Sequence, residues 1–287
     1  MGTLLLQMMN ALSYGFLLFL ITCGISIVFG ILGVLNLAHG SLYLLGSYIG
    51  YSLIMQAGLP FWVAILAVPL IIAALGYITE IAILRPTYKL GHLSQVLLTF
   101  GLVYVFHDIF SIVWGKEVLT VNPPEMFSSS VEILGYAIPS YRLALIVIGA
   151  VIVVGLWYIQ EKTKWGAVIR AGLSDKEMVG ALGVNIHFVF TMVFVFGSLL
   201  AGLGGVLGAP ILGTYPGMEF SILILSLVVL VVGGLGSVTG TFLASLLVGF
   251  VETFSRYLVP ELSLIITFAL MALVLVVRPQ GLVGRKA

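Results

Sequence analysis

The sequence predicts an all-α polytopic integral membrane protein with about eight or nine transmembrane helices, some of them broken or re-entrant. Two compositional features predict this class: hydrophobic residues make up 61% of the 287 residues, and charged residues make up only 8%. Soluble domains carry about 25% charged residues, so the chain lies far outside their range. The third observation is the length of the apolar runs, which matches one bilayer crossing each.

A helix needs roughly 20 apolar residues to cross the hydrocarbon layer, and nine runs approach that length. The expected spans are residues 5–33, 37–57, 60–84, 94–114, 141–159, 186–209, 219–235, 239–257 and 261–277. The region 218–257 fits two short helices broken at Gly233-Gly234-Leu235-Gly236-Ser237, or one helix plus a re-entrant piece. The first run has no basic residues before it and no cleavage site after it, which favours a membrane helix over a removed signal peptide.

The distribution of Lys and Arg between the loops predicts the orientation. With nine crossings and an external N-terminus, nine of the 12 basic residues fall on the cytoplasmic side. These are Arg85, Lys89, Lys162, Lys164, Arg170, Lys176, Arg278, Arg285 and Lys286, which leaves Lys116, Arg142 and Arg256 outside. We therefore expect one membrane domain, 1–287, with a cytoplasmic C-terminus, a cytoplasmic loop at about 160–185 and an extended external loop at about 115–140.

The composition excludes several classes of function. A net charge of +1 without a basic stripe argues against a nucleic-acid partner. The single cysteine, Cys23, excludes a disulfide framework, and the four scattered histidines lack the spacing of a metal pair. No catalytic Ser/His/Asp arrangement and no P-loop motif are present, so we expect neither an enzyme nor an ATP site on this chain.

Closely spaced glycines mark expected helix–helix contacts. The stretch GLGGVLG at 202–208 superficially resembles a dinucleotide fingerprint, but it follows a membrane helix and lacks the required spacing. Small residues that let two helices approach explain it better, and we interpret Gly46/Gly50 and Gly236/Gly240 in the same way.

Ionisable residues within the apolar runs lie near the expected ends of the spans. Glu80 precedes Arg85, and Glu252 stands four residues before Arg256, where a helix would pair them. His107, Asp108 and Glu219 are also placed toward span ends. We interpret all of these as interfacial pairs or snorkelling groups and not as a proton relay. Energy for any active transport would then come from another protein.

A charged segment in the middle of the chain, Glu161–Asn185, is here called the island. It carries Glu161, Lys162, Lys164, Arg170, Asp175, Lys176 and Glu177. Ser174 and Glu177 form a capping box, Asp175 suits the positive end of the helix dipole, and Gly183 suits a glycine stop. The helix between them would present Met178, Val179, Ala181 and Leu182 as a small apolar patch.

Because a helix of two turns is marginal alone, the island is expected to dock on the membrane domain and on another protein. The alternative is an ordinary solvated loop with a capped turn.

Motifs over nearly the whole chain resemble the LivH-type permeases of branched-chain amino acid ABC importers. They are GILGVLNLAHGSLYLLGSY at 30–48, ILRPTYKLGHLSQVLLTFGL at 83–102, the island, AGLGGVLGAPILG at 201–213, VVGGLGSVTGTFLASLLVG at 231–249 and VRPQGLVG at 277–284. The order of NLAHG, GGLGSVTG and the RPQGL tail makes the resemblance specific.

The resemblance implies a permease subunit in a bacterial or archaeal inner membrane that works by alternating access. It implies a second, LivM-type permease, two cytoplasmic ATPases that use ATP and Mg²⁺, and an external solute-binding protein; this chain itself would bind no cofactor and no metal. The island would then be the coupling helix that docks on an ATPase. Its coupling residues would be Arg170, Ser174, Asp175, Glu177, Met178, Leu182 and Gly183.

The resemblance implies branched-chain or other amino acids as the solute, with urea or a short amide as the alternative within the family. A free-standing channel or carrier for small neutral solutes is the alternative outside it. Polar residues within the apolar spans are candidates for the solute path: Asn36, His39, Tyr43, Ser47, Gln95, Thr99 and Tyr104. The NLAHG motif would break its helix and free backbone groups to face a cavity, unless Asn36 and His39 only cap a turn or bond neighbouring helices.

Overall fold

The computed structural model describes residues 2–33, 35–133, 135–174 and 176–283, and most of them are helical. The α-helices are α1 (Gly2–Leu32), α2 (His39–Tyr51), α3 (Phe61–Thr79), α4 (His92–Val113), α5 (Ser140–Lys162), α6 (Lys164–Ser174), α7 (Lys176–Ala181), α8 (Ile186–Leu212), α9 (Met218–Gly233), α10 (Val238–Leu258) and α11 (Ser263–Val277). Short π and 3-10 turns are η1 (Ser52–Gln56), η2 (Glu80–Leu84), η3 (Arg85–Lys89), η4 (Glu125–Phe127) and η5 (Pro260–Leu262).

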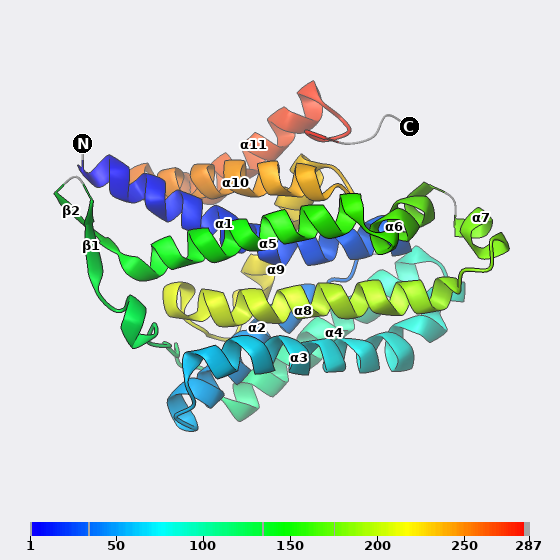
Figure 1. The fold of residues 1–287 in the computed structure, drawn as a ribbon, viewed down its shortest axis with the longest axis horizontal. Helices are drawn as coiled ribbons and strands as arrows, with labels where there is room; N and C mark the ends of the chain where they lie inside the picture. The colour runs from blue at the N-terminus through cyan, green and yellow to red at the C-terminus, as the bar shows by residue number, and fades with distance from the viewer. Residues whose placement is uncertain (1, 34, 134, 175, 284–287) are drawn as a thin grey trace.

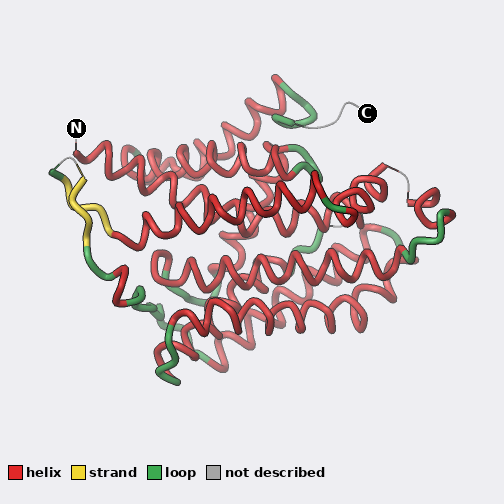
Figure 2. The backbone as a smooth tube through the Cα atoms, viewed as in Figure 1, coloured by secondary structure: helices red, strands yellow, loops and turns green. Residues whose placement is uncertain are grey.

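The helices lie roughly lengthwise beside one another (Figure 1). The start of α1 and the hairpin of β1 (Ser130–Ile133) and β2 (Tyr136–Pro139) lie at one end, which we call the hairpin end. Helices α6 and α7 lie at the opposite end, which we call the island end (Figure 1). Figure 2 shows loops at both of these ends and further loop segments between the helices. Loop segments between the ends must lie against protein, because irregular backbone is costly in contact with lipid.

Each of the nine apolar runs contains a helix, but the helices differ in length. Seven helical stretches in the described residues are long and apolar enough to cross a membrane. The other two, α2 and α9, have only 13 and 16 residues. The all-helical membrane fold is therefore confirmed, and the number of crossings and the orientation stay predictions. The region 218–257 forms two helices with a break at 234–237, the first of the two expected arrangements.

Helix α1 forms the centre of the bundle. Its most apolar stretch is 83% buried, whereas those of α4 and α11 are only 17% and 11% buried. Two fully buried side chains of α1 show its partners: Phe19 meets Phe242 of α10 edge-on, and Ile21 lies against Gly204 of α8. Helices α4 and α11 thus form the periphery, where lipid or another subunit can contact them.

Glycines bring the central helices into close contact, as their spacing predicts. A Cβ atom on Gly46 of α2 would lie 2.8 Å from the Cα of Gly202 on α8, and one on Gly24 of α1 would lie 3.1 Å from the Cα of Gly197. Gly240 packs against Gly233 in the same manner. Gly236 does not fit this interpretation, because it lies in the α9–α10 turn with a φ of 76°.

We expect Gly46→Ala to lower the melting temperature of the protein, because its Cβ would meet the α8 backbone and force two helices apart. Overpacking of this kind costs about 1–3 kcal/mol. Gly101→Ala on α4 is the control, since nothing lies within 4 Å of that Cβ and alanine favours the helix. Thermal unfolding in detergent measures both, and equal melting temperatures would contradict the close contact.

The external loop differs from its prediction. Residues 115–140 contain η4 and an antiparallel hairpin in which Ser130 pairs with Pro139 and Ile133 with Tyr136. Leu119 also forms a bridge with Thr214, with reciprocal N–H to carbonyl distances of 2.9 Å. Most described residues of this segment are exposed, in agreement with a surface loop. The hairpin within it was not predicted, because strands of four residues are too short to leave an alternating pattern.

Candidate functional site

Two broken segments meet inside the bundle. After α1 ends at Leu32, the chain turns at Gly33, whose φ is 74°, and α2 starts at His39. The His39 imidazole Nε2 lies 2.9 Å from the carbonyl oxygen of Ile21 on α1. At 1.5 Å per residue, Ile21 is about 16 Å along α1 from Leu32. The NLAHG segment therefore returns deep into the bundle before α2 begins.

The second broken segment joins α8 to α9. Gly213 and Gly217 have φ angles of 70° and 98°, and α9 starts at Met218. A Cβ atom on Gly40 at the start of α2 would overlap the carbonyl oxygen of Glu219. The starts of the two half-length helices are thus in contact within the protein, which is the arrangement that broken helices adopt in transporters.

Glu219 anchors the start of α9. Its side chain is fully buried, its Oε1 lies 2.6 Å from Nδ1 of His107 on α4, and its Oε2 accepts a hydrogen bond of 2.8 Å from the Gly217 amide. Glu219 is therefore paired, one of the two expected arrangements, and its buried side chain does not snorkel. The partner could not be predicted, because it stands 112 residues away.

The candidate path residues of the NLAHG segment and α2 are buried in contacts within the protein. Asn36 Oδ1 accepts a hydrogen bond of 3.1 Å from the Ala38 amide, so this side chain caps the local turn. The Ser47 and Thr214 hydroxyl oxygens are 2.5 Å apart. Tyr43 is fully buried against Gly204 and Gly208 of α8. The motif breaks the helix as expected, and the contacts of Asn36 and His39 are those of the alternative, in which they serve the turn and a neighbouring helix.

The remaining candidate path residues lie on α4 and do not share one environment. Gln95 Nε2 donates to the Thr87 carbonyl at 3.1 Å, and the Thr99 hydroxyl donates to the Val96 carbonyl at 3.0 Å. Tyr104 is 52% exposed, with its ring against Phe100 and Phe220. Of the seven candidates, Tyr104 is the one whose side chain reaches the surface of the described chain.

The island contains two helices, not the single one expected. Helix α6 follows α5 after one extended residue, Thr163, whose hydroxyl accepts a hydrogen bond from the Gly166 amide at 3.2 Å. It ends at Ser174, and α7 follows from Lys176 to Ala181. The capping signals between Ser174 and Gly183 predict only the second of these helices, so α6 was not expected.

The expected capping box falls largely outside what the structure describes. Asp175 lies outside the described residues, as do the side chains of Ser174 and Glu177. The other end of α7 is described: Gly183 has a φ of 84° and donates a hydrogen bond to the Gly180 carbonyl at 3.0 Å. Two residues later, Asn185 caps α8 by accepting a 3.1 Å hydrogen bond from the Phe188 amide.

The apolar side chains of α7 and of the turn that follows it differ in exposure. Val179 is 5% exposed, whereas Met178 and Leu182 are 58% and 76% exposed. Arg170, on α6, lies 3.8 Å from Glu161 at the end of α5. The island therefore attaches to the bundle through one set of apolar side chains and presents another set at the island end, where α7 projects (Figure 1).

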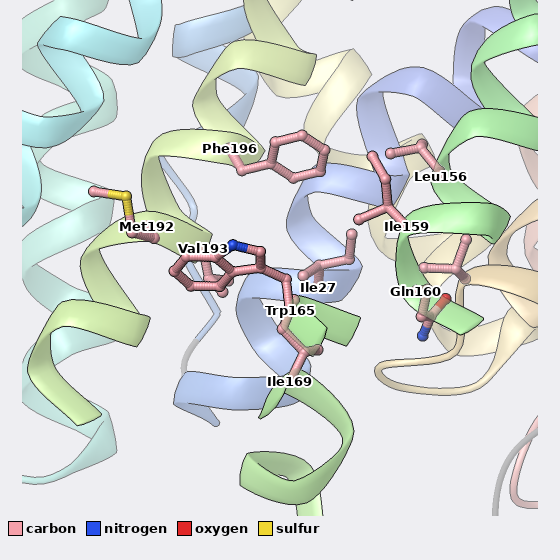
Figure 3. Close-up of a pocket in the computed structure, with 10 residues that line it drawn as sticks. Ile27, Leu156, Ile159, Gln160, Trp165, Ile169, Met192, Val193 and Phe196 are labelled. Atoms are coloured by element: carbon pink, nitrogen blue, oxygen red, sulfur yellow. The ribbon is translucent and has the colours of Figure 1, made fainter. Parts of the chain in front are cut away.

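Helix α6 covers an apolar cavity of about 240 Å³ between α1, α5 and α8. Figure 3 shows Trp165 and Ile169 of α6 beside Ile27 of α1 and Val193 and Phe196 of α8. Apolar residues thus hold α6 on the bundle without filling the space beneath it.

Elsewhere on α8, a buried carboxylate joins the η2–η3 turn to this helix. Glu80 is fully buried and lies 2.9 Å from Arg85. It also accepts hydrogen bonds of 3.0 Å from Tyr88 and from Thr191 of α8. The sequence predicted the Glu80–Arg85 pair but not the contribution of Thr191, whose position gives no signal before the fold is known.

Comparisons with a family model and with individual proteins indicate the same family for this chain. Residues 7–275 match the family described as branched-chain amino acid transport system / permease component. The chain is 29% identical to the branched-chain amino acid permease protein LivH of Salmonella typhimurium, over 97% of this chain and 95% of the relative. It is 29% identical to BraD of Pseudomonas aeruginosa, with the same coverage.

The chain is also 27% identical to the permease protein LivM of Escherichia coli, over 90% of this chain and 66% of the relative. These relatives are named as permease proteins of transport systems, in agreement with a transporter subunit and not an enzyme. No solved structure matches the chain.

Proposed function

The chain belongs to the branched-chain amino acid permease family, and we propose that it is the membrane-spanning subunit of an ATP-driven importer of branched-chain or other net-neutral amino acids. The observation that carries the ATP-driven part is the island. Met178 on α7 and Leu182 in the turn that follows it are exposed, and short connections join the island to two long helices, α5 and α8. A chain without an ATP motif needs such a surface to receive work from an ATPase.

The connections on both sides of the island favour transmission of force. Thr163 alone separates α5 from α6, and four residues separate α7 from α8. Movement of α7 by an ATPase would therefore tilt α5 and α8 directly. The apolar cavity beneath Trp165 and Ile169 leaves room for α6 to shift (Figure 3). We propose that this tilt alternates access between the two sides of an inner membrane.

The proposed partners follow from the family. LivH and LivM are both similar to this chain, which supports a pair of homologous permeases in one transport system. Two cytoplasmic ATPases that bind ATP and Mg²⁺ and an external solute-binding protein complete the proposed importer. Peripheral α4 and α11 are the described helices with the most surface left for a second permease.

The proposal is tested by reconstitution. The chain is placed in liposomes alone, or with the second permease, ATPases and binding protein encoded by neighbouring genes. We expect leucine uptake only in the complete set and only with ATP. ATP-independent leucine or urea flux through the chain alone would show a free-standing channel or carrier. ATP-driven uptake of urea but not of leucine would assign the chain to urea or amide transport.

A further inference from the structure

A polar cavity opens between five helices at the hairpin end and contains none of the candidate path residues. Its volume is about 420 Å³, within the range of roughly 300–1,000 Å³ that small-molecule sites occupy. The starts of α1 and α5, which lie together at this end, supply part of its wall (Figure 1). The ends of α8 and α10 and the first turns of α9 supply the rest.

One wall of the cavity carries a cation that lacks a partner. Arg142, in the first turn of α5, is half-buried and has no hydrogen bond or ion pair with any residue that the structure describes. Its guanidinium stays charged at any physiological pH and presents a planar fork that fits a carboxylate. A desolvated charge without a partner is costly, so an anion in the cavity would stabilise it.

The second arginine of the cavity is already neutralised. Arg256 Nε lies 2.5 Å from Glu252 Oε1, and the other Glu252 oxygen accepts a hydrogen bond of 2.7 Å from Thr267. The Glu252 side chain is 3% exposed, so this pair is fixed on the cavity wall. Arg142 is therefore the arginine of the cavity without a carboxylate partner among the described residues.

A carboxylate lies on the same cavity wall. Glu252 of α10 lines the cavity, and a ligand ammonium group would be favoured electrostatically near it. The cavity thus combines a cation without a carboxylate partner, Arg142, with a carboxylate, Glu252, on another helix.

The floor of the cavity is apolar. Met218, Ile222 and Leu225 of α9 line it, and all three are buried. An aliphatic side chain placed against them would be removed from water, at a gain of roughly 25 cal/mol per Å² of buried apolar area. The floor belongs to one of the two half-length helices, so the cavity extends from the hairpin end toward the broken segments.

We propose that this cavity binds a free α-amino acid with an aliphatic side chain. Its carboxylate would pair with Arg142, its ammonium would lie near Glu252, and its side chain would lie on Ile222 and Leu225. This proposal rests on the proposed function, from which the class of solute is taken. What it adds is the position on this chain at which the solute binds. The neutral Glu252–Arg256 pair leaves one cation for one carboxylate, which favours a zwitterion over a cationic amino acid.

The test measures binding of radiolabelled L-leucine and of leucinamide, which lacks the carboxylate, to the full chain in lipid nanodiscs. Leucine should bind about 10- to 100-fold more tightly, the range for one charge-assisted hydrogen-bonded group. Arg142→Gln should remove this preference and Arg142→Lys should retain part of it. Lys116→Gln, which changes an exposed cation outside the cavity, is the matched control and should leave the preference unchanged.

Three outcomes would overturn the site. The first is no leucine binding at concentrations that saturate uptake by the complete transporter, and the second is equal affinity for leucine and leucinamide in the unmodified chain. The third is a phospholipid that co-purifies in an Arg142-dependent manner and is not displaced by leucine, which would make the cavity a lipid headgroup site. ATP-driven leucine uptake in the complete transporter, measured in parallel, separates loss of this site from failure of the proposed function.

Discussion

Replacing both Met178 and Leu182 with Asp is expected to abolish association with the ATPases while leaving the chain folded in the membrane. The two side chains are 58% and 76% exposed, so charges at these positions are solvated in the isolated chain and cost its fold little. At an interface they would be desolvated opposite apolar groups. Loss of a central apolar contact costs about 2 kcal/mol or more, so two such changes should weaken binding at least 100-fold.

Co-purification with the ATPases and ATP-driven uptake measure this prediction. Met126→Asp is the control, because Met126 is 70% exposed in η4 at the opposite, hairpin end. It introduces one Asp, where the double variant introduces two, at similar exposure and should leave ATPase binding unchanged. Val179→Asp is a second comparison: Val179 is 5% exposed, so this change should reduce the yield of folded protein. If the double variant retains its ATPases and its uptake, α7 is not the coupling surface.

The sequence predicted best those structural features that depend only on residues close together in the chain. Apolar run length located every long helix, and the break at 234–237 was visible because several glycines interrupt one run. Glycine spacing also predicted close contacts such as Gly46 with Gly202, since one helix face can be inferred without its partner. Family resemblance added the function class, which no composition argument could supply.

Properties that depend on two distant segments could not be predicted in the same way. Glu219 and His107 form a pair across 112 residues, and Arg142 shares its cavity with Asn10 from a different helix. The candidate path residues show the same limit, because Asn36 and His39 are polar residues whose hydrogen bonds lie within the protein. Polarity in an apolar run identifies a residue that needs a partner, but only the fold shows whether that partner is protein or solute.

Glu80→Ala is expected to destabilise the protein more than any other single change considered for the island end. It removes the acceptor for Tyr88 and Thr191 and leaves the Arg85 guanidinium without its carboxylate. Breaking a buried ion pair costs about 3–5 kcal/mol. Since Arg85 is 35% exposed and can turn toward water, we expect the lower end of this range.

A set of variants separates the charge from the hydrogen bonds at Glu80. Glu80→Gln keeps an acceptor for Tyr88 and Thr191 but loses the ion pair, so its melting temperature in detergent should fall between those of the wild type and Glu80→Ala.

The double variant Glu80→Ala/Arg85→Ala should lose less stability than the sum of the two single changes. Each single change leaves the other residue's charge unpaired, whereas the double variant has no charge left at either position. Glu261→Ala, an exposed carboxylate in η5, should have little effect. Strict additivity, or a Glu80→Ala protein as stable as Glu261→Ala, would show that this network does not hold the η2–η3 turn on α8. In that case the Glu80 carboxylate would not be the group that ties this turn to the helix adjoining the island.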